Sequence, residues 1–146
     1  YRPRHAMGAA PVIMYVHGGG FMAGSTIETD ADLRWFADLG WLVVSVDYRL
    51  FPEGAPTWDR APADVACAAA WLADHAAHLG GDIGRLAILG DSAGGNLAIN
   101  VAYAAARGGL RSDCGAGAGD AAEAGAGAAV PMVFSSSVTR RSSSIS

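Results

Sequence analysis

The sequence predicts an α/β fold with three layers, in which helices cover both faces of a mostly parallel central sheet. Three short apolar runs alternate with three segments of helical periodicity. The apolar runs lack the polar alternation of half-exposed strands, so each is expected to be buried on both faces. Buried strands separated by helices are typical of a parallel sheet, whose carboxyl ends share one edge.

The predicted elements alternate along the chain. The strands are expected over residues 12–16, 41–46 and 85–89, and the helices over residues 30–39, 62–79 and 93–107. Pro62 suits the first turn of its helix, where its missing N–H is not needed. Gly40 and Gly80 each follow a helical segment and are expected to end it.

Residues 1–107 and 108–146 differ in character, which predicts one folded domain followed by a low-complexity tail. Residues 115–129 are almost entirely Gly and Ala, and residues 135–146 are largely Ser. Neither stretch has the periodicity or the bulk to build a core, so we expect most of the tail to be disordered or foreign to the fold. Residues 130–134 could begin a further strand.

Composition and charge exclude several classes of function. The chain has 146 residues, 51% hydrophobic and 16% charged, with a formal net charge of −4. The sequence lacks the basic clusters of a nucleic-acid surface and any apolar run long enough to span a membrane. No signal peptide is visible, so a cytoplasmic location is expected. Cys67 and Cys114 indicate neither a zinc site nor a disulfide framework, and Cys67 is interpreted as a small apolar helix residue.

The strongest chemical motif lies between the third strand and the third helix. It is Gly90-Asp91-Ser92-Ala93-Gly94, which matches the pattern G-x-S-x-G. In a strand–turn–helix setting this pattern is a nucleophile elbow, which exposes the serine hydroxyl on a strained turn. Gly90 and Gly94 supply the room that the turn needs. The alternative is a plain serine N-cap of the helix.

A glycine run follows the first strand and predicts an oxyanion-binding loop. It is His17-Gly18-Gly19-Gly20-Phe21. Glycines there allow backbone N–H groups to face a cavity, and each such donor is worth roughly 3–4 kcal/mol to the transition state of acyl transfer. A flexible turn or a phosphate loop is the alternative. A phosphate loop requires a different glycine spacing or a following Lys-Ser/Thr, which the sequence lacks.

Histidines are candidates for the base that would activate Ser92. His17 precedes the serine and lies on the glycine loop itself, whereas the order expected in this fold is serine, acid, then histidine. We therefore expect His17 to brace the loop. His75 and His78 fall in the second helix and are interpreted as solvated or packed helix residues.

Three motifs together resemble the hormone-sensitive-lipase-like branch of the α/β-hydrolases. That branch is typified by an HGGG loop, a DYRL-x-PE stretch and a GDSAGG elbow, which correspond here to residues 17–20, 47–53 and 90–95. The motifs occur in the family's order, and the resemblance covers about residues 11–107.

The resemblance implies a partial α/β-hydrolase fold and an esterase or lipase-like hydrolase that needs no cofactor. Ser92 would attack a small-molecule carboxylic ester and form an acyl-enzyme. Gly19, Gly20 and the N–H of Ala93 would form the oxyanion hole. Residues 47–53 would brace the site without taking part in the chemistry. The oligomeric state is left open.

The sequence departs from the family at the base and the acid of the triad. The family places both well after the serine, yet no histidine follows Ser92. Asp113, Asp120 and Glu123 lie in or beside the Gly/Ala stretch with no strand before them, so none is assigned to the triad. We expect a fragment or misread gene model of a longer esterase, with negligible ester turnover on its own. The alternative is a short homologue that has lost catalysis and binds a ligand.

Overall fold

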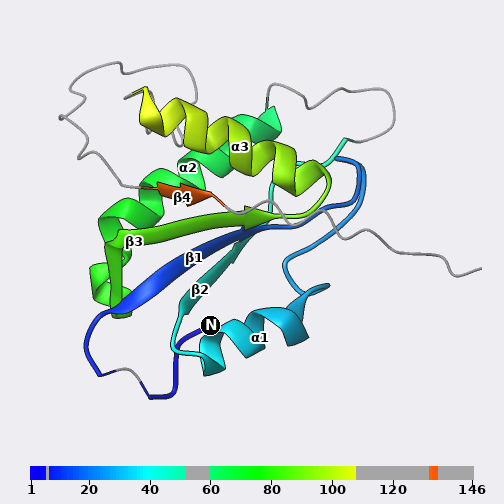
Figure 1. Ribbon diagram of the computed structural model, residues 1–146. Helices are drawn as coiled ribbons and strands as arrows, with labels where there is room; N and C mark the ends of the chain where they lie inside the picture. Colours follow the sequence, from blue (N-terminus) through cyan, green and yellow to red (C-terminus); the bar gives the residue numbers. More distant parts are fainter. Residues whose placement is uncertain (6, 52–59, 108–131, 135–146) are drawn as a thin grey trace, which may run out of the picture.

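The structure, a computed structural model, describes residues 1–5, 7–51, 60–107 and 132–134. Within these ranges one sheet has the order β2-β1-β3-β4 (Figure 1). Its strands are β1 (Ala10–Val16), β2 (Leu42–Val46), β3 (Gly81–Gly90) and β4 (Met132–Phe134). Every pairing is parallel, which confirms the predicted sheet.

Helices cover both faces of the sheet, as the sequence predicts. They are α1 (Asp30–Asp38), α2 (Arg60–His75), the short 3₁₀ helix η1 (Ala77–Leu79) and α3 (Ala93–Ala106). In Figure 1, α1 lies on one face, and α2 and α3 lie together on the other. The result is a three-layer α/β fold.

The alternation of side chains along β1 divides the core in two. Val12, Met14 and Val16 are buried in the larger cluster, with residues of α2 and α3. Ile13 points the other way and packs with Leu33 of α1. A central strand with apolar side chains on both faces explains why β1 has no polar alternation.

The sequence prediction is least accurate around Gly80 and Gly81. The second helix ends at His75 rather than at residue 79, and β3 begins at Gly81 rather than at residue 85. Gly80 has a φ of +85° and ends η1, as a C-terminal glycine does. Gly81 then pairs with Ala10, and a Cβ at Gly81 would lie 2.6 Å from the Leu42 side chain. Glycine is therefore part of the buried strand here as well as a stop signal.

Two further expectations have a structural outcome. β4 occupies residues 132–134, within the stretch that could begin a strand, while residues 108–131 and 135–146 lie outside the described residues. Cys67 forms a disulfide, which corrects its interpretation as a plain apolar residue. The spacing of cysteines along the sequence does not show which sulfur atoms lie close together in the fold. Among the described residues, the helices are all too short or too polar to cross a membrane.

Candidate active site

The carboxyl ends of β1 and β3 bring the two glycine motifs together. The two strands are neighbours, and Val16 is in register with Gly90. The chain leaves β1 toward α1 on one face and leaves β3 toward α3 on the other (Figure 1). Neighbouring strands whose connections diverge in this way form a topological switch point, where open α/β sheets bind ligands. His17 and Asp91 begin the two loops at this point.

Ser92 has the strained backbone that a nucleophile elbow requires. Its φ is 50° and its ψ is −117°, a conformation that L residues rarely adopt. The side chain is exposed and makes no capping hydrogen bond to α3. Ser92 thus occupies the N-cap position of α3 without the side-chain bond of an ordinary N-cap residue. The hydroxyl stands at the positive end of α3, where developing negative charge is favoured.

Two glycines allow the elbow to pack closely. A Cβ on Gly90 would lie 2.5 Å from the carbonyl of Gly94. A Cβ on Gly94 would overlap the carbonyl oxygens of Val16 and His17. The first turn of α3 thus lies directly against the end of β1, as the prediction of small residues two positions from Ser92 requires.

The glycine loop turns through left-handed conformations. Gly19, Gly20 and Phe21 have φ values of 112°, 63° and 64°. The Gly19 carbonyl accepts hydrogen bonds from the N–H groups of Met22 and Ala23, each at 3.1 Å. This turn exposes Gly19 and Gly20 beside the elbow.

Several backbone N–H groups at this edge have no acceptor within the described residues. They include those of Gly19, Gly20 and Ala93, the residues that the sequence analysis assigns to the oxyanion hole, and also those of Gly18, Phe21 and Ser92. The N–H of Ala93 is free because it opens α3, where the first N–H groups have no intrahelical partner.

His17 is buried and bonded within its own loop. Its side chain is 2% exposed, and Nδ1 lies 2.8 Å from the Gly18 carbonyl oxygen. Its ring stacks on Tyr48 with a centroid separation of 4.4 Å. Nε2 lies 3.5 Å from Asp47 Oδ1 but makes no hydrogen bond. The two ring nitrogens of His17 thus face the Gly18 carbonyl and Asp47.

The described part of the 47–53 stretch makes hydrogen bonds to the glycine loop, to Thr26 and to α2. Asp47 accepts a hydrogen bond from the Thr26 N–H at 2.9 Å. The Tyr48 hydroxyl donates to the His17 carbonyl at 2.9 Å. Arg49 bonds Asp64 of α2 through Nε and Nη2, at 2.7–3.0 Å. Residues 52–59 lie outside the described residues.

Sequence reasoning missed one contact of the elbow. The Tyr15 hydroxyl donates a hydrogen bond of 2.6 Å to Asp91 Oδ1. Burial of the ring, and then this hydrogen bond, raise the pKa of Tyr15 to about 12. Tyr15 lies one residue before the end of β1, so the bond ties that strand to the elbow. A tyrosine two residues before the glycine motif is the only sequence signal for it.

The other candidate groups are not brought to this edge. His75 stacks on Trp71 near the end of α2, with a centroid separation of 4.4 Å, and His78 lies in η1. Both precede the amino end of β3, opposite the Ser92 edge of a parallel sheet. Asp113, Asp120 and Glu123 lie outside the described residues. Within the described ranges, acidic, histidine and cysteine side chains nowhere gather in a group able to hold a metal.

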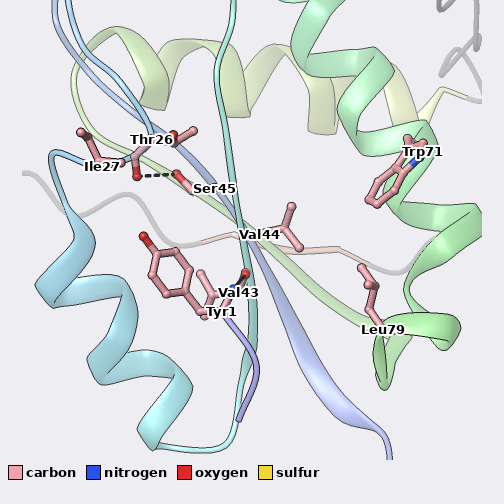
Figure 2. A pocket seen from close by; sticks show the side chains of 8 residues that line it. All are labelled: Tyr1, Thr26, Ile27, Val43, Val44, Ser45, Trp71 and Leu79. Atoms are coloured by element: carbon pink, nitrogen blue, oxygen red, sulfur yellow. Dashed lines mark hydrogen bonds between the residues drawn. The ribbon is translucent and has the colours of Figure 1, made fainter.

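A shallow open pocket lies away from the elbow, along the outer side of β2. Figure 2 shows Val43, Val44 and Ser45 along the strand, with Trp71 and Leu79 on the opposite side of the pocket. None of its lining residues belongs to the glycine loop or the elbow. Its position gives it no contact with the hydroxyl of Ser92.

Known proteins share the sequence and the fold of this chain. The family described as α/β hydrolase fold matches residues 13–142. Esterase LipI of Mycobacterium tuberculosis is 44% identical over 97 residues, which are 66% of this chain and 30% of that protein. Hormone-sensitive lipase of Homo sapiens is 40% identical over 111 residues, 75% of this chain and 10% of the lipase.

Solved structures agree with these sequence matches. An esterase of Pyrobaculum calidifontis superposes with a TM-score of 0.65 at 47% identity, covering 74% of this chain and 35% of that one. The chain thus spans about a third or less of the length of these relatives.

Proposed function

The chain belongs to the α/β-hydrolase fold family, among its hormone-sensitive-lipase-like esterases, and on that premise we propose that it is a serine hydrolase of carboxylic esters that works through Ser92. The observation that carries the proposal is the hydroxyl of Ser92. It is exposed on a strained turn, makes no capping bond, and shares its edge of the sheet with several backbone N–H groups that have no acceptor within the described residues, including those of Gly19, Gly20 and Ala93.

The proposed reaction is acyl transfer in two steps. The Ser92 oxygen attacks the ester carbonyl carbon, and the carbonyl oxygen takes up negative charge. The N–H groups of Gly19, Gly20 and Ala93 stabilise that oxyanion. The carbon–oxygen bond to the alcohol then breaks, the alcohol leaves with a proton, and water releases the acid from the acyl-enzyme. No cofactor enters these steps.

A serine hydroxyl needs a base to react quickly. His17 is unsuited to this role because its Nδ1 is held by the Gly18 carbonyl and its Nε2 faces Asp47. We therefore propose that the base and its acid partner are not among the described residues. Without them, acylation would depend on the oxyanion donors and on binding, which alone supply only a small part of the rate of a complete triad.

Mass spectrometry of the protein after incubation with p-nitrophenyl butyrate tests the proposal. We expect slow addition of one butyryl group to Ser92, with negligible turnover, and no such addition to Ser92→Ala. Ser25→Ala, which changes a serine between the glycine loop and α1, should be acylated at the same rate as the wild type. Acylation that persists in Ser92→Ala would overturn the proposal, and so would ligand binding without any acylation.

A further inference from the structure

The carboxylate of Asp91 lies between the serine elbow and the glycine loop. Asp91 directly precedes Ser92, where β3 leads into α3 (Figure 1). Its Oδ1 accepts the hydrogen bond of 2.6 Å from the Tyr15 hydroxyl. Its Oδ2 lies close to Gly18, where an added Cβ would overlap it. The carboxylate is therefore held beside both motifs.

The charge of Asp91 has no cationic partner among the described residues. None of the ion pairs within the described ranges includes Asp91. Arg49, the basic residue that follows β2, is bonded to Asp64 of α2. The residue Asp91 is exposed, and the tyrosine hydroxyl that bonds it orients the carboxylate without neutralising its charge.

The first turn of α3 does not need this carboxylate as a cap. The backbone carbonyl of Asp91 accepts hydrogen bonds from the N–H groups of Gly94 and Gly95, at 2.9 and 3.2 Å. The side chain bonds Tyr15 instead. An asparagine or a serine at this position could accept the same bond as a neutral group. What the carboxylate adds to these alternatives is its negative charge.

The field of Asp91 extends beyond its hydrogen-bonded neighbour. Burial of the Tyr48 side chain raises the pKa of Tyr48, and the negative charge of Asp91 raises it further. The Tyr48 hydroxyl bonds the carbonyl of His17, at the start of the glycine loop. An ester bound at Ser92 would lie between this loop and the elbow, and so within the same field. Such a field attracts cationic groups and repels anionic ones.

We propose that Asp91 is a specificity-determining residue, which makes the Ser92 site prefer esters that carry a cationic group to esters that carry an anionic one. This inference rests on the proposed function of Ser92. The favoured substrate class is a carboxylic ester whose acyl or alcohol part bears a positive charge, such as an ammonium group. The charged group does not have to touch Asp91, because Coulomb attraction acts over about 10 Å at moderate ionic strength.

The first test measures this charge preference without catalysis. Ser92→Cys places a thiol at the elbow, and methanethiosulfonate reagents modify it. The thiol gives its proton to solvent, its sulfur bonds to the sulfenyl sulfur of the reagent, and methanesulfinate leaves. One reagent carries a trimethylammonium-ethyl tail and the other a sulfonato-ethyl tail. Mass spectrometry of the peptide that contains position 92 gives the two rate constants, and their ratio cancels the reactivity of the thiol itself.

We expect Asp91→Asn, added to Ser92→Cys, to lower the ratio of the cationic to the anionic rate constant about tenfold at low salt. Asp91→Ser should give the same change, so the test does not depend on the folding of one variant. The effect should shrink in high salt. Asp74→Asn, which removes an exposed charge near the end of α2, is the matched control and should leave the ratio unchanged. An unchanged ratio in either folded Asp91 variant would overturn the inference.

The second test uses Ser92 itself. Two p-nitrophenyl esters of equal length carry a trimethylammonium or a carboxylate at the end of the acyl chain. The ratio of their acylation rates should be about tenfold higher in the wild type than in Asp91→Asn. If no ester acylates the wild type, the proposed function fails, and the thiol ratio alone decides whether Asp91 sets the charge preference. If the wild type is acylated with the same ratio as Asp91→Asn, the proposed function stands and this inference fails.

Discussion

Tyr15 and Asp91 are 76 residues apart in the chain and share a hydrogen bond of 2.6 Å. The bond forms because β1 and β3 are parallel neighbours in which Tyr15 is in register with Leu89, two residues before Asp91. The hydroxyl of Tyr15 thus reaches across to the first residue after β3. It fixes the residue next to Ser92 without touching Ser92 itself.

The Tyr15 bond should make stability depend on pH in the alkaline range. The raised pKa of about 12 means that the folded protein keeps a proton that the unfolded chain loses near pH 10. The contribution of Tyr15 to the free energy of unfolding is complete below about pH 10 and is lost as the pH rises toward 12. In urea unfolding, the wild type should have a higher free energy of unfolding than Tyr15→Phe. This difference should be constant from pH 7 to about 9.5 and should shrink above pH 10. A difference that is still undiminished at pH 11.5 would contradict this assignment.

Gly94→Ala should be strongly destabilising. Its Cβ would overlap the backbone oxygens of Val16 and His17, which cannot move without displacing β1. We expect a loss of about 3 kcal/mol in the free energy of unfolding, at the upper end for overpacked sites. Urea denaturation measures it.

Gly84→Ala is the matched control. Its new Cβ would lie 3.1 Å from Asp82 Oδ1, the end of an exposed side chain that can move. It should change stability by less than about 1 kcal/mol. Equal losses at Gly84 and Gly94 would show that the close contact of α3 with β1 is not the cause.

Ser92→Gly should stabilise the protein. Glycine adopts a φ of 50° with a ψ of −117° without the steric strain that serine suffers there. After the greater entropy of glycine in the unfolded chain is subtracted, we expect a gain of about 1 kcal/mol. Ser92→Ala also lacks the hydroxyl but keeps the strain, so it should show no such gain in the same urea experiment. If both variants gain equally, the strain is not in the backbone.

Local patterns were sufficient to predict the turn between β3 and α3 at Ser92 and the glycine-rich loop after β1. Ser92 and its glycines are adjacent in sequence, and the strand and helix on either side have clear periodicity. The Tyr15–Asp91 bond depends instead on which strands are neighbours and on their register. His17 illustrates the same limit, because its place in the sequence argued against a base but could not show which atom it holds.

Strand ends were also harder to predict than strand centres. Gly81 looks like a helix stop in sequence, yet it is buried between the side chains of Val12 and Leu42. Its burial depends on a register that jumps between Pro11 and Val12. Such an irregularity has no local pattern in the sequence. The centre of β3, from Leu86 to Leu89, was predicted correctly because it is continuously apolar.

Asp64→Asn should weaken the link between the 47–53 stretch and α2. Burial alone would raise the pKa of Asp64, but the hydrogen bonds and charge of Arg49 outweigh it and lower that pKa below its usual value. The carboxylate therefore stabilises the fold at neutral pH, and its contribution disappears as the pH falls through the lowered pKa. We expect Asp64→Asn to lose about 1–2 kcal/mol at pH 7, typical of charge-assisted hydrogen bonds in a partly exposed pair. The difference from wild type, measured by urea unfolding, should vanish toward pH 2.

Asp38→Asn, which removes an exposed pairing with Arg4 at 3.9 Å, should have little effect at either pH. A difference at Asp64 that persists unchanged in acid would mean that shape, and not charge, holds Arg49 there.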